Sequence, residues 1–137
     1  MLGSEIHQAG SNITTERLRF DFNFDRKIEE GEVSDIEKYV NSAIVQGFEV
    51  DTRDMEKSVA KSEGVEGSFW DKYPEIVKVW TMKNIATGEV YSKELCGGPH
   101  VKSSDMFKKE DGTFKVFKIS KQESVSQGVR RIKATLE

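Results

Sequence analysis

The chain has 137 residues, of which 36% are hydrophobic and 33% charged, a composition that suits one folded domain. Its net charge of −3 excludes the overall basic field of a stand-alone nucleic-acid-binding protein, although a local basic patch could still hold such a partner. The apolar runs are too short to span a membrane, and the N-terminus does not resemble a signal peptide. Because one cysteine cannot form an internal disulfide, we expect a cytoplasmic protein with no membrane partner.

Hydrophobic periodicity predicts a strand and then a helix in the first third of the chain. Strict alternation over residues 17–24 places Leu and Phe side chains on one face, which is typical of a half-buried strand. Ser34, with Glu37 three residues later, forms a capping-box pattern, and apolar residues then recur at helical spacing. Gly47 supplies the stop, so we expect a helix from about Ser34 to Gly47.

Shorter patterned segments make up the rest of the chain. They predict, in order, a strand at 48–52, a short helix at 54–61, a hairpin formed by 76–82 and 90–95 around Thr87-Gly88, and strands at 114–119 and 129–136. Runs of strands with a few helices indicate the α+β class. We therefore predict a mixed, mainly antiparallel sheet with a few helices packed on it.

The segment Cys96-Gly97-Gly98-Pro99-His100, directly after a predicted strand, is the main candidate for chemistry. Cysteine and histidine are preferred zinc ligands, and two glycines let the backbone turn tightly enough for both side chains to face one ion. This is half of a tetrahedral site, because structural zinc needs four protein ligands and catalytic zinc usually has three plus water. Two alternatives are an incidental pair and a Cys–His nucleophilic pair, for which the sequence shows no third, orienting residue.

Two other polar segments are weaker candidates. The segment from His7 to Ser11 is interpreted as a polar, glycine-containing turn. Arg130 and Arg131 are adjacent on a predicted strand, so their side chains project to opposite faces and at most one can line a given pocket. They fit either a solvated strand edge or contact with a phosphate or carboxylate.

Four segments, taken in order, resemble the editing domain of alanyl-tRNA synthetase and the free-standing AlaX trans-editing proteins, and more distantly that of threonyl-tRNA synthetase. They are Gln8-x-Gly10-Ser11, Arg17-Leu18-Arg19-Phe20-Asp21-Phe22, Glu94-Leu95-Cys96-Gly97-Gly98-Pro99-His100-Val101 and Gly128-Val129-Arg130-Arg131-Ile132-Lys133-Ala134. The resemblance covers nearly the whole chain. Its Pro99 is closer to the threonyl pattern, whereas the second and fourth segments are closer to the alanyl one.

The resemblance implies a zinc-assisted deacylase that hydrolyses alanine tRNA mischarged with serine or glycine. It implies the following roles: Cys96 and His100 as zinc ligands; Gln8 and Glu94 in catalysis; Gly10, Ser11, Arg130 and Arg131 in substrate binding. The family's His-x-x-x-His pair would precede Leu2, so we expect residues 1–137 to form a single editing domain that is truncated at its N-terminus.

The sequence is also compatible with other functions. The rest of a synthetase is a possible partner besides tRNA. The main alternative to a deacylase is a non-catalytic module that binds the tRNA acceptor end, or an inactive fragment that keeps the fold without the complete zinc site. A plain interaction domain is a third alternative.

Overall fold

The computed structural model describes residues 1–67, 69–96 and 99–137. The chain divides into two compact units: unit 1 comprises Met1–Ser42 and Thr113–Glu137, and unit 2 comprises Ala43–Gly112. The α+β prediction is confirmed, because both named sheets are antiparallel and each unit contains helical residues. The single domain expected over residues 1–137 stays a prediction.

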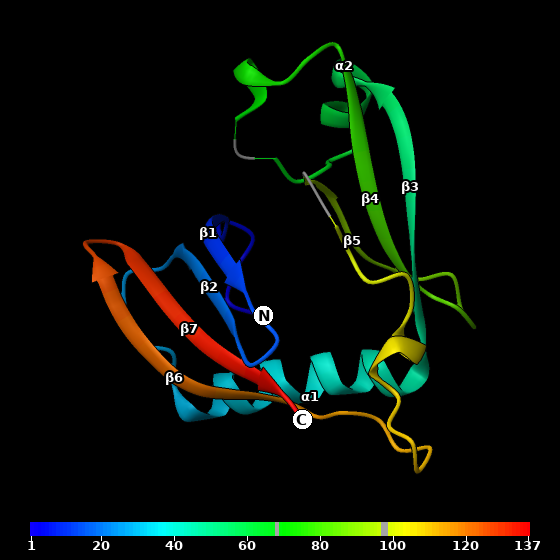
Figure 1. Cartoon of the computed structure of the whole chain (residues 1–137). Helices are drawn as coiled ribbons and strands as arrows, with labels where there is room; N and C mark the ends of the chain where they lie inside the picture. The colour runs from blue at the N-terminus through cyan, green and yellow to red at the C-terminus, as the bar shows by residue number, and fades with distance from the viewer. Residues whose placement is uncertain (68, 97–98) are drawn as a thin grey trace. The chain divides into compact units, whose positions relative to one another are not determined.

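Unit 1 is built on a four-stranded antiparallel sheet in the order β1-β2-β7-β6. Figure 1 shows the C-terminal strand β7 between β2 and β6, so strands from opposite ends of the sequence pair directly. The strands are β1 (Gln8–Ile13), β2 (Leu18–Asn23), β6 (Phe117–Ser126) and β7 (Val129–Leu136). The predicted strands at 17–24 and 129–136 are thereby confirmed.

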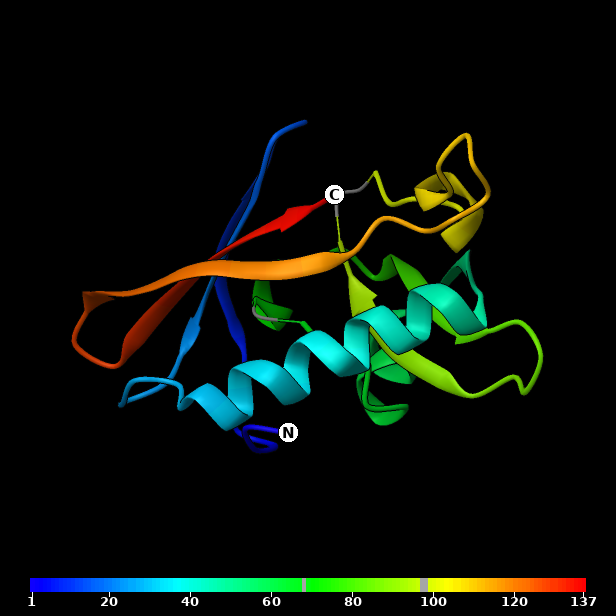
Figure 2. The same cartoon turned by 90° about the horizontal axis from the view of Figure 1, so that it is seen from below.

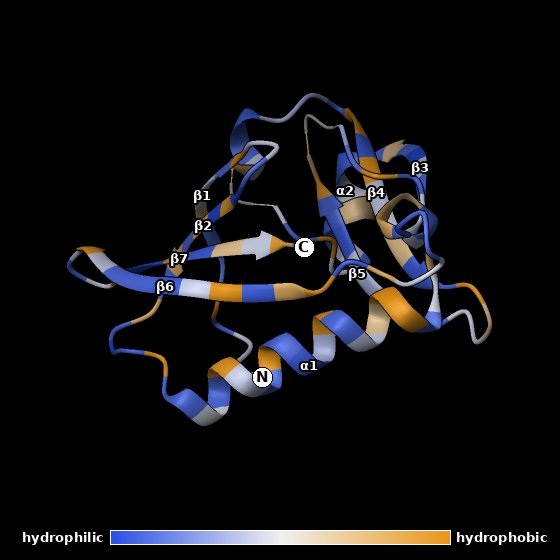
Figure 3. Ribbon diagram, turned by 60° about the horizontal axis from the view of Figure 1, so that its bottom comes forward, coloured by the Kyte–Doolittle hydropathy of each residue, from blue (hydrophilic) through white to orange (hydrophobic). Residues whose placement is uncertain are grey.

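The helix α1 (Glu30–Gln46) runs beside β6 and covers one face of this sheet (Figure 2). Its apolar and polar residues alternate along the ribbon (Figure 3). Val33 and Ile36 of the helix pack against a buried cluster formed by Phe22, Ile28 and Ile132. Two polar contacts fix it to β6. Glu37 Oε1 accepts a hydrogen bond from the Ile119 amide at 2.7 Å, and Asn41 bonds both backbone groups of Phe117.

The predicted start of this helix at Ser34 is wrong by four residues. The helix begins at Glu30, and Glu32 Oε2 accepts the Glu29 amide proton at 2.9 Å, as in the second half of a capping box. Arg26 also bonds both oxygens of Glu32. The predicted end at Gly47 is confirmed, since its φ of +93° favours glycine after the last helical residue.

Two further expectations in unit 1 are corrected. The segment His7–Ser11, interpreted as a turn, supplies most of β1, because pairing with β2 gives this polar stretch its backbone hydrogen bonds despite low strand propensity. The strand predicted at 114–119 lies at 117–126. Its second half has few apolar residues, and its pairing with β7, with two register shifts, holds it in the sheet.

Unit 2 contains a three-stranded antiparallel sheet in the order β3-β4-β5. Its elements are β3 (Phe48–Glu56), α2 (Lys57–Ser62), β4 (Ile76–Asn84), β5 (Val90–Leu95) and the short 3₁₀ turns Trp70–Lys72 and Ser104–Phe107. The predicted hairpin is confirmed, whereas β3 continues to Glu56 and delays the predicted short helix to Lys57. The core is a buried group of Ala60, Val65, Val77 and Val79.

Helices of the described part of the chain are either too short or too polar to cross a membrane.

Candidate metal centre

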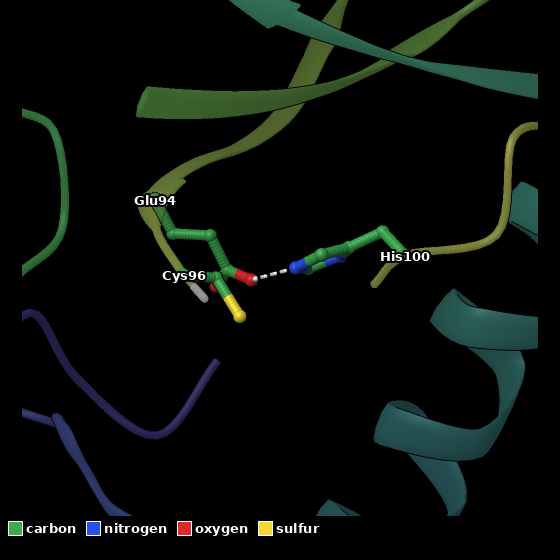
Figure 4. Close-up of side chains that lie close together, drawn as sticks. All are labelled: Glu94, Cys96 and His100. Carbon is green, nitrogen blue, oxygen red and sulfur yellow. Dashed lines mark ion pairs between the residues drawn. The ribbon is translucent and has the colours of Figure 1, made fainter. Parts of the chain in front are cut away.

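Three side chains with metal-binding atoms converge at the end of β5. Glu94 lies in the strand, Cys96 follows it, and His100 comes four residues further on. One donor atom from each residue lies within 4.8 Å of the other two. Figure 4 shows the carboxylate of Glu94 and the thiol of Cys96 extending from the same stretch of backbone, with the His100 imidazole pointing toward them. The structure thus brings together the three residues of unit 2 that the sequence singled out.

The spacing of the His100 and Glu94 donor atoms fits two ligands of one tetrahedral ion. His100 Nε2 lies 3.3 Å from Glu94 Oε1, and two such ligands, each about 2.0–2.1 Å from a tetrahedral zinc, are roughly 3.3–3.4 Å apart. The Nε2 atom is buried and has no hydrogen-bond partner of acceptable geometry among the described residues. A buried nitrogen left in this way needs an explanation, and a metal ion provides one. The donor set of Cys, His and Glu is one that zinc accepts.

Glu94 is also the candidate for the third residue that a Cys–His nucleophilic pair needs. A nucleophile's base is usually oriented by another group, and Glu94 Oε1 lies 3.3 Å from His100 Nε2. Cys96 is exposed, so its thiol is accessible. The tight turn expected of Gly97 and Gly98 lies outside the described residues.

Trp80 of β4 contacts this group, and the sequence analysis did not single it out. It pairs directly with Glu94 across the hairpin, donates a hydrogen bond from Nε1 to the Cys96 carbonyl at 2.9 Å, and stacks on His100. The signal was available in the sequence. Counting back from the predicted turn at Thr87-Gly88 places this aromatic residue opposite the segment that ends in Cys96.

The other predicted site residues lie in unit 1. Gln8, Gly10 and Ser11 belong to the edge strand β1, where Gly10 pairs with Asp21 and Ser11 with Phe20 of β2. Gln8 and Ser11 are exposed, and Gly10 is half-buried. The structure brings these three residues together on one strand, and their roles stay predictions.

Arg130 and Arg131 are adjacent on β7 and have different hydrogen-bond partners. Arg131 forms a two-pronged pair with Asp21, from Nε to Oδ1 at 2.7 Å and from Nη2 to Oδ2 at 2.9 Å. This hydrogen bonding is the main reason that the pKa of Asp21 lies below its ordinary value of 3.8. Arg130 donates from Nη2 to Gln122 Oε1 at 3.2 Å. The expected split between the two faces of the strand agrees with these separate partners.

Curated relatives match the chain over almost its whole length. Alanine–tRNA ligase of Borreliella burgdorferi is 41% identical over 136 residues, which is 99% of this chain and 21% of that protein. Alanine–tRNA ligase of Treponema denticola is 40% identical over 137 residues, which is 100% of the chain and 21% of the relative. The enzyme of Thermotoga maritima is 38% identical over 134 residues, 98% of the chain and 14% of the relative.

This chain is a homologue of a segment of alanine–tRNA ligase. The resemblance to alanyl-tRNA synthetase drawn from its four sequence segments is therefore confirmed. The chain spans about a fifth or less of the length of these alanine–tRNA ligases. No protein-family model matches it.

Proposed function

We propose that this chain is an aminoacyl-tRNA editing domain that hydrolyses alanine tRNA mischarged with serine or glycine. The observation that carries the proposal is the convergence of Glu94, Cys96 and His100 in a chain homologous to a segment of alanine–tRNA ligase. A ligase that charges a small amino acid discriminates poorly by binding alone, so hydrolysis of the wrong product is the usual remedy.

The proposed metal is zinc, held by Cys96 and His100 with Glu94 beside them. Zinc bound in such a site makes an ester carbonyl more electrophilic, or a water molecule more acidic. Three protein donors leave one tetrahedral position for water or substrate, which is the catalytic rather than the structural pattern. If Glu94 holds the ion through one carboxylate oxygen, its second oxygen would be the group placed to take a proton from water.

Substrate contacts are proposed within unit 1, on the basis of the sequence resemblance. Gln8 contributes its amide to catalysis, and Gly10 and Ser11 hydrogen-bond the serine hydroxyl that alanine lacks. Of the two arginines, Arg131 has a guanidinium fixed by Asp21 and therefore presents its remaining donors in one orientation. Arg131 is therefore the preferred contact to the terminal adenosine or its phosphate, and Arg130, on the other face of β7, is the alternative.

The charge distribution of unit 1 supports tRNA as the partner. Ile132 of β7 faces α1, so its basic neighbours along the strand project to the opposite face of the sheet. That opposite face carries more basic than acidic side chains. The acidic residues of this face, Asp21 and Glu123, are shared among several cations. The basic residues are Arg19, Lys118, Lys121, Arg131 and Lys133. Such a face suits a phosphate backbone.

Release of serine from seryl-tRNA specific for alanine tests the proposal. We expect zinc-dependent release by the wild-type chain, a loss of at least about 100-fold in Cys96→Ala, and a large loss in Glu94→Gln. The matched control Lys115→Gln changes an exposed side chain outside the proposed site and should leave the rate unchanged. Binding of tRNA by folded protein without release would contradict the deacylase and assign the non-catalytic acceptor-end module.

The wider setting forms part of the same proposal. A segment of a ligase acts together with the rest of that ligase, so the remainder of a synthetase is the proposed protein partner. The cytoplasm, where tRNA is charged, is the proposed location.

A further inference from the structure

Trp80 occupies a position in unit 2 from which it reaches both ends of the segment that carries Cys96 and His100. It lies in the middle of β4 and pairs directly with Glu94 of β5. Its neighbour Val79 is 1% exposed and points into the core of unit 2. Because side chains alternate along a strand, the indole projects to the other face of the sheet. Trp80 is half-buried there.

The first contact of Trp80 is with the backbone at the start of this segment. Its Nε1–H donates a hydrogen bond to the Cys96 carbonyl at 2.9 Å. Cys96 has just left β5, whose ladder with β4 includes Leu95 opposite Val79. Cys96 lies one residue beyond the end of β5, and the indole N–H gives its carbonyl the hydrogen bond that a strand partner would otherwise give. This bond holds the Cys96 backbone in one position at the end of the strand.

The second contact is with the side chain at the other end of the segment. The rings of Trp80 and His100 stack with centroids 4.6 Å apart and an interplanar angle of 26°. Stacking opposes rotation of the imidazole about its Cβ–Cγ bond, because that rotation would tilt the ring out of the stack. The edge carrying Nε2 then faces Glu94, as the distance of 3.3 Å to Oε1 shows.

We propose that Trp80 is a positioning residue that prearranges Cys96 and His100 for metal binding. The inference rests on the proposed function, because it takes these two residues to be metal ligands. One side chain fixes the backbone of one ligand and the ring plane of the other. Groups that orient metal ligands from behind typically contribute 10–100-fold to metal affinity, and prearranged ligands bind more tightly because less ordering is needed on binding.

Titration of the full chain with Co²⁺, a spectroscopic substitute for zinc, tests this inference. Trp80→Phe keeps a ring that can stack on His100 and loses the N–H, whereas Trp80→Leu loses both contacts. We expect Co²⁺ affinity to fall about tenfold in Trp80→Phe and about 100-fold in Trp80→Leu, with a weaker thiolate-to-cobalt absorption band. The chain's other tryptophan provides the matched control. Trp70 packs edge-on against Tyr73 in the core of unit 2, so Trp70→Phe should leave the affinity and the band unchanged.

A second measurement needs no metal and guards against variants that fold poorly. The chain has only two histidines, so the ring-proton NMR signal of His100 can be assigned against that of His7. Stacking on an indole shifts the His100 signal upfield in the wild-type chain. The shift should disappear in Trp80→Leu and persist in Trp70→Phe.

The outcomes separate the inference from the function on which it rests. Unchanged Co²⁺ affinity in folded Trp80→Phe and Trp80→Leu, or no upfield shift in the wild-type chain, would overturn the positioning role. A wild-type chain that binds no Co²⁺ would overturn both the role and the metal site. Trp80-dependent Co²⁺ binding without release of serine from tRNA would support the positioning role while contradicting the deacylase.

Discussion

Asp21 and Arg131 form a two-pronged charge pair between neighbouring strands of unit 1, and both belong to segments of the sequence that carry the family resemblance. The Asp21 side chain is only 10% exposed, and Arg131 bonds both of its oxygens. Arg19 lies on the same face, 3.8 Å from Asp21. The conformation of Arg131 is therefore determined by a carboxylate on the neighbouring strand before any ligand arrives.

The lowered pKa of Asp21 predicts how stability depends on pH. A carboxyl whose pKa is lower in the folded than in the unfolded state stabilises the fold above the ordinary carboxyl pKa, and this contribution is lost as the pH falls through the lowered value. Asp21→Asn should therefore lower the Tm at neutral pH by about 4–8 °C. The difference from the wild-type chain should shrink below about pH 4.

Thermal unfolding of the two proteins across this pH range checks the prediction. Asp35→Asn, at an exposed position on α1, is the matched control and should show little change in Tm. Equal Tm values at neutral pH, or a difference that is undiminished in acid, would count against the Asp21–Arg131 pair as a stabilising contact.

At the scale of elements, the two glycines of the α1 region have opposite requirements. Gly47 ends the helix with a φ of +93°, and an added Cβ would meet only ordinary contacts, so the strain of a side chain there is that of the backbone. Gly31 lies in the first turn, has no positive φ, and has nothing within 4 Å of an added Cβ. The positive φ at Gly47 requires a glycine, whereas Gly31 could be replaced and only weakens the helix.

Alanine substitutions at the two positions should therefore have opposite effects. Gly47→Ala should lower the free energy of unfolding by about 1–2 kcal/mol, and Gly31→Ala should raise it by up to about 1 kcal/mol. Urea unfolding of both variants measures this difference. Destabilisation of similar size at both positions would show that the helix end does not depend on the backbone conformation of Gly47.

Local signals account for the elements that the sequence predicted well. The Phe-rich alternation of β2, the turn before β5 and the glycine after α1 are all determined by neighbours in the chain. The errors lie where distant partners decide. β1 and the second half of β6 are polar, and they become strands because β2 and β7 supply the pairing.

At the scale of the whole molecule, sequence patterns could not predict how the strands are distributed between two sheets. β2 pairs with β7 across more than a hundred residues, and no local pattern encodes that pairing. The distribution also separates the predicted site residues into two sets. Glu94, Cys96 and His100 belong to unit 2, and the remaining ones belong to unit 1.

The candidate site was only partly predictable for the same reason. Cys96 and His100 lie only four residues apart in the sequence, so their spacing alone suggested a pair of metal ligands. The contribution of Trp80 comes from strand pairing, because it lies opposite Glu94 only once the hairpin has formed.

The zinc content of the purified chain tests the central claim, that Glu94, Cys96 and His100 hold one ion. We expect about one zinc per wild-type chain after exposure to zinc and extensive dialysis. Cys96→Ala and His100→Ala should retain almost none, and Glu94→Gln should retain less than wild type, because an amide is a weaker ligand than a carboxylate. Lys115→Gln, which leaves all three donors in place, should bind as the wild type does. Zinc-free wild-type protein, or equal zinc in the wild-type chain and the Cys96 and His100 variants, would contradict the metal centre.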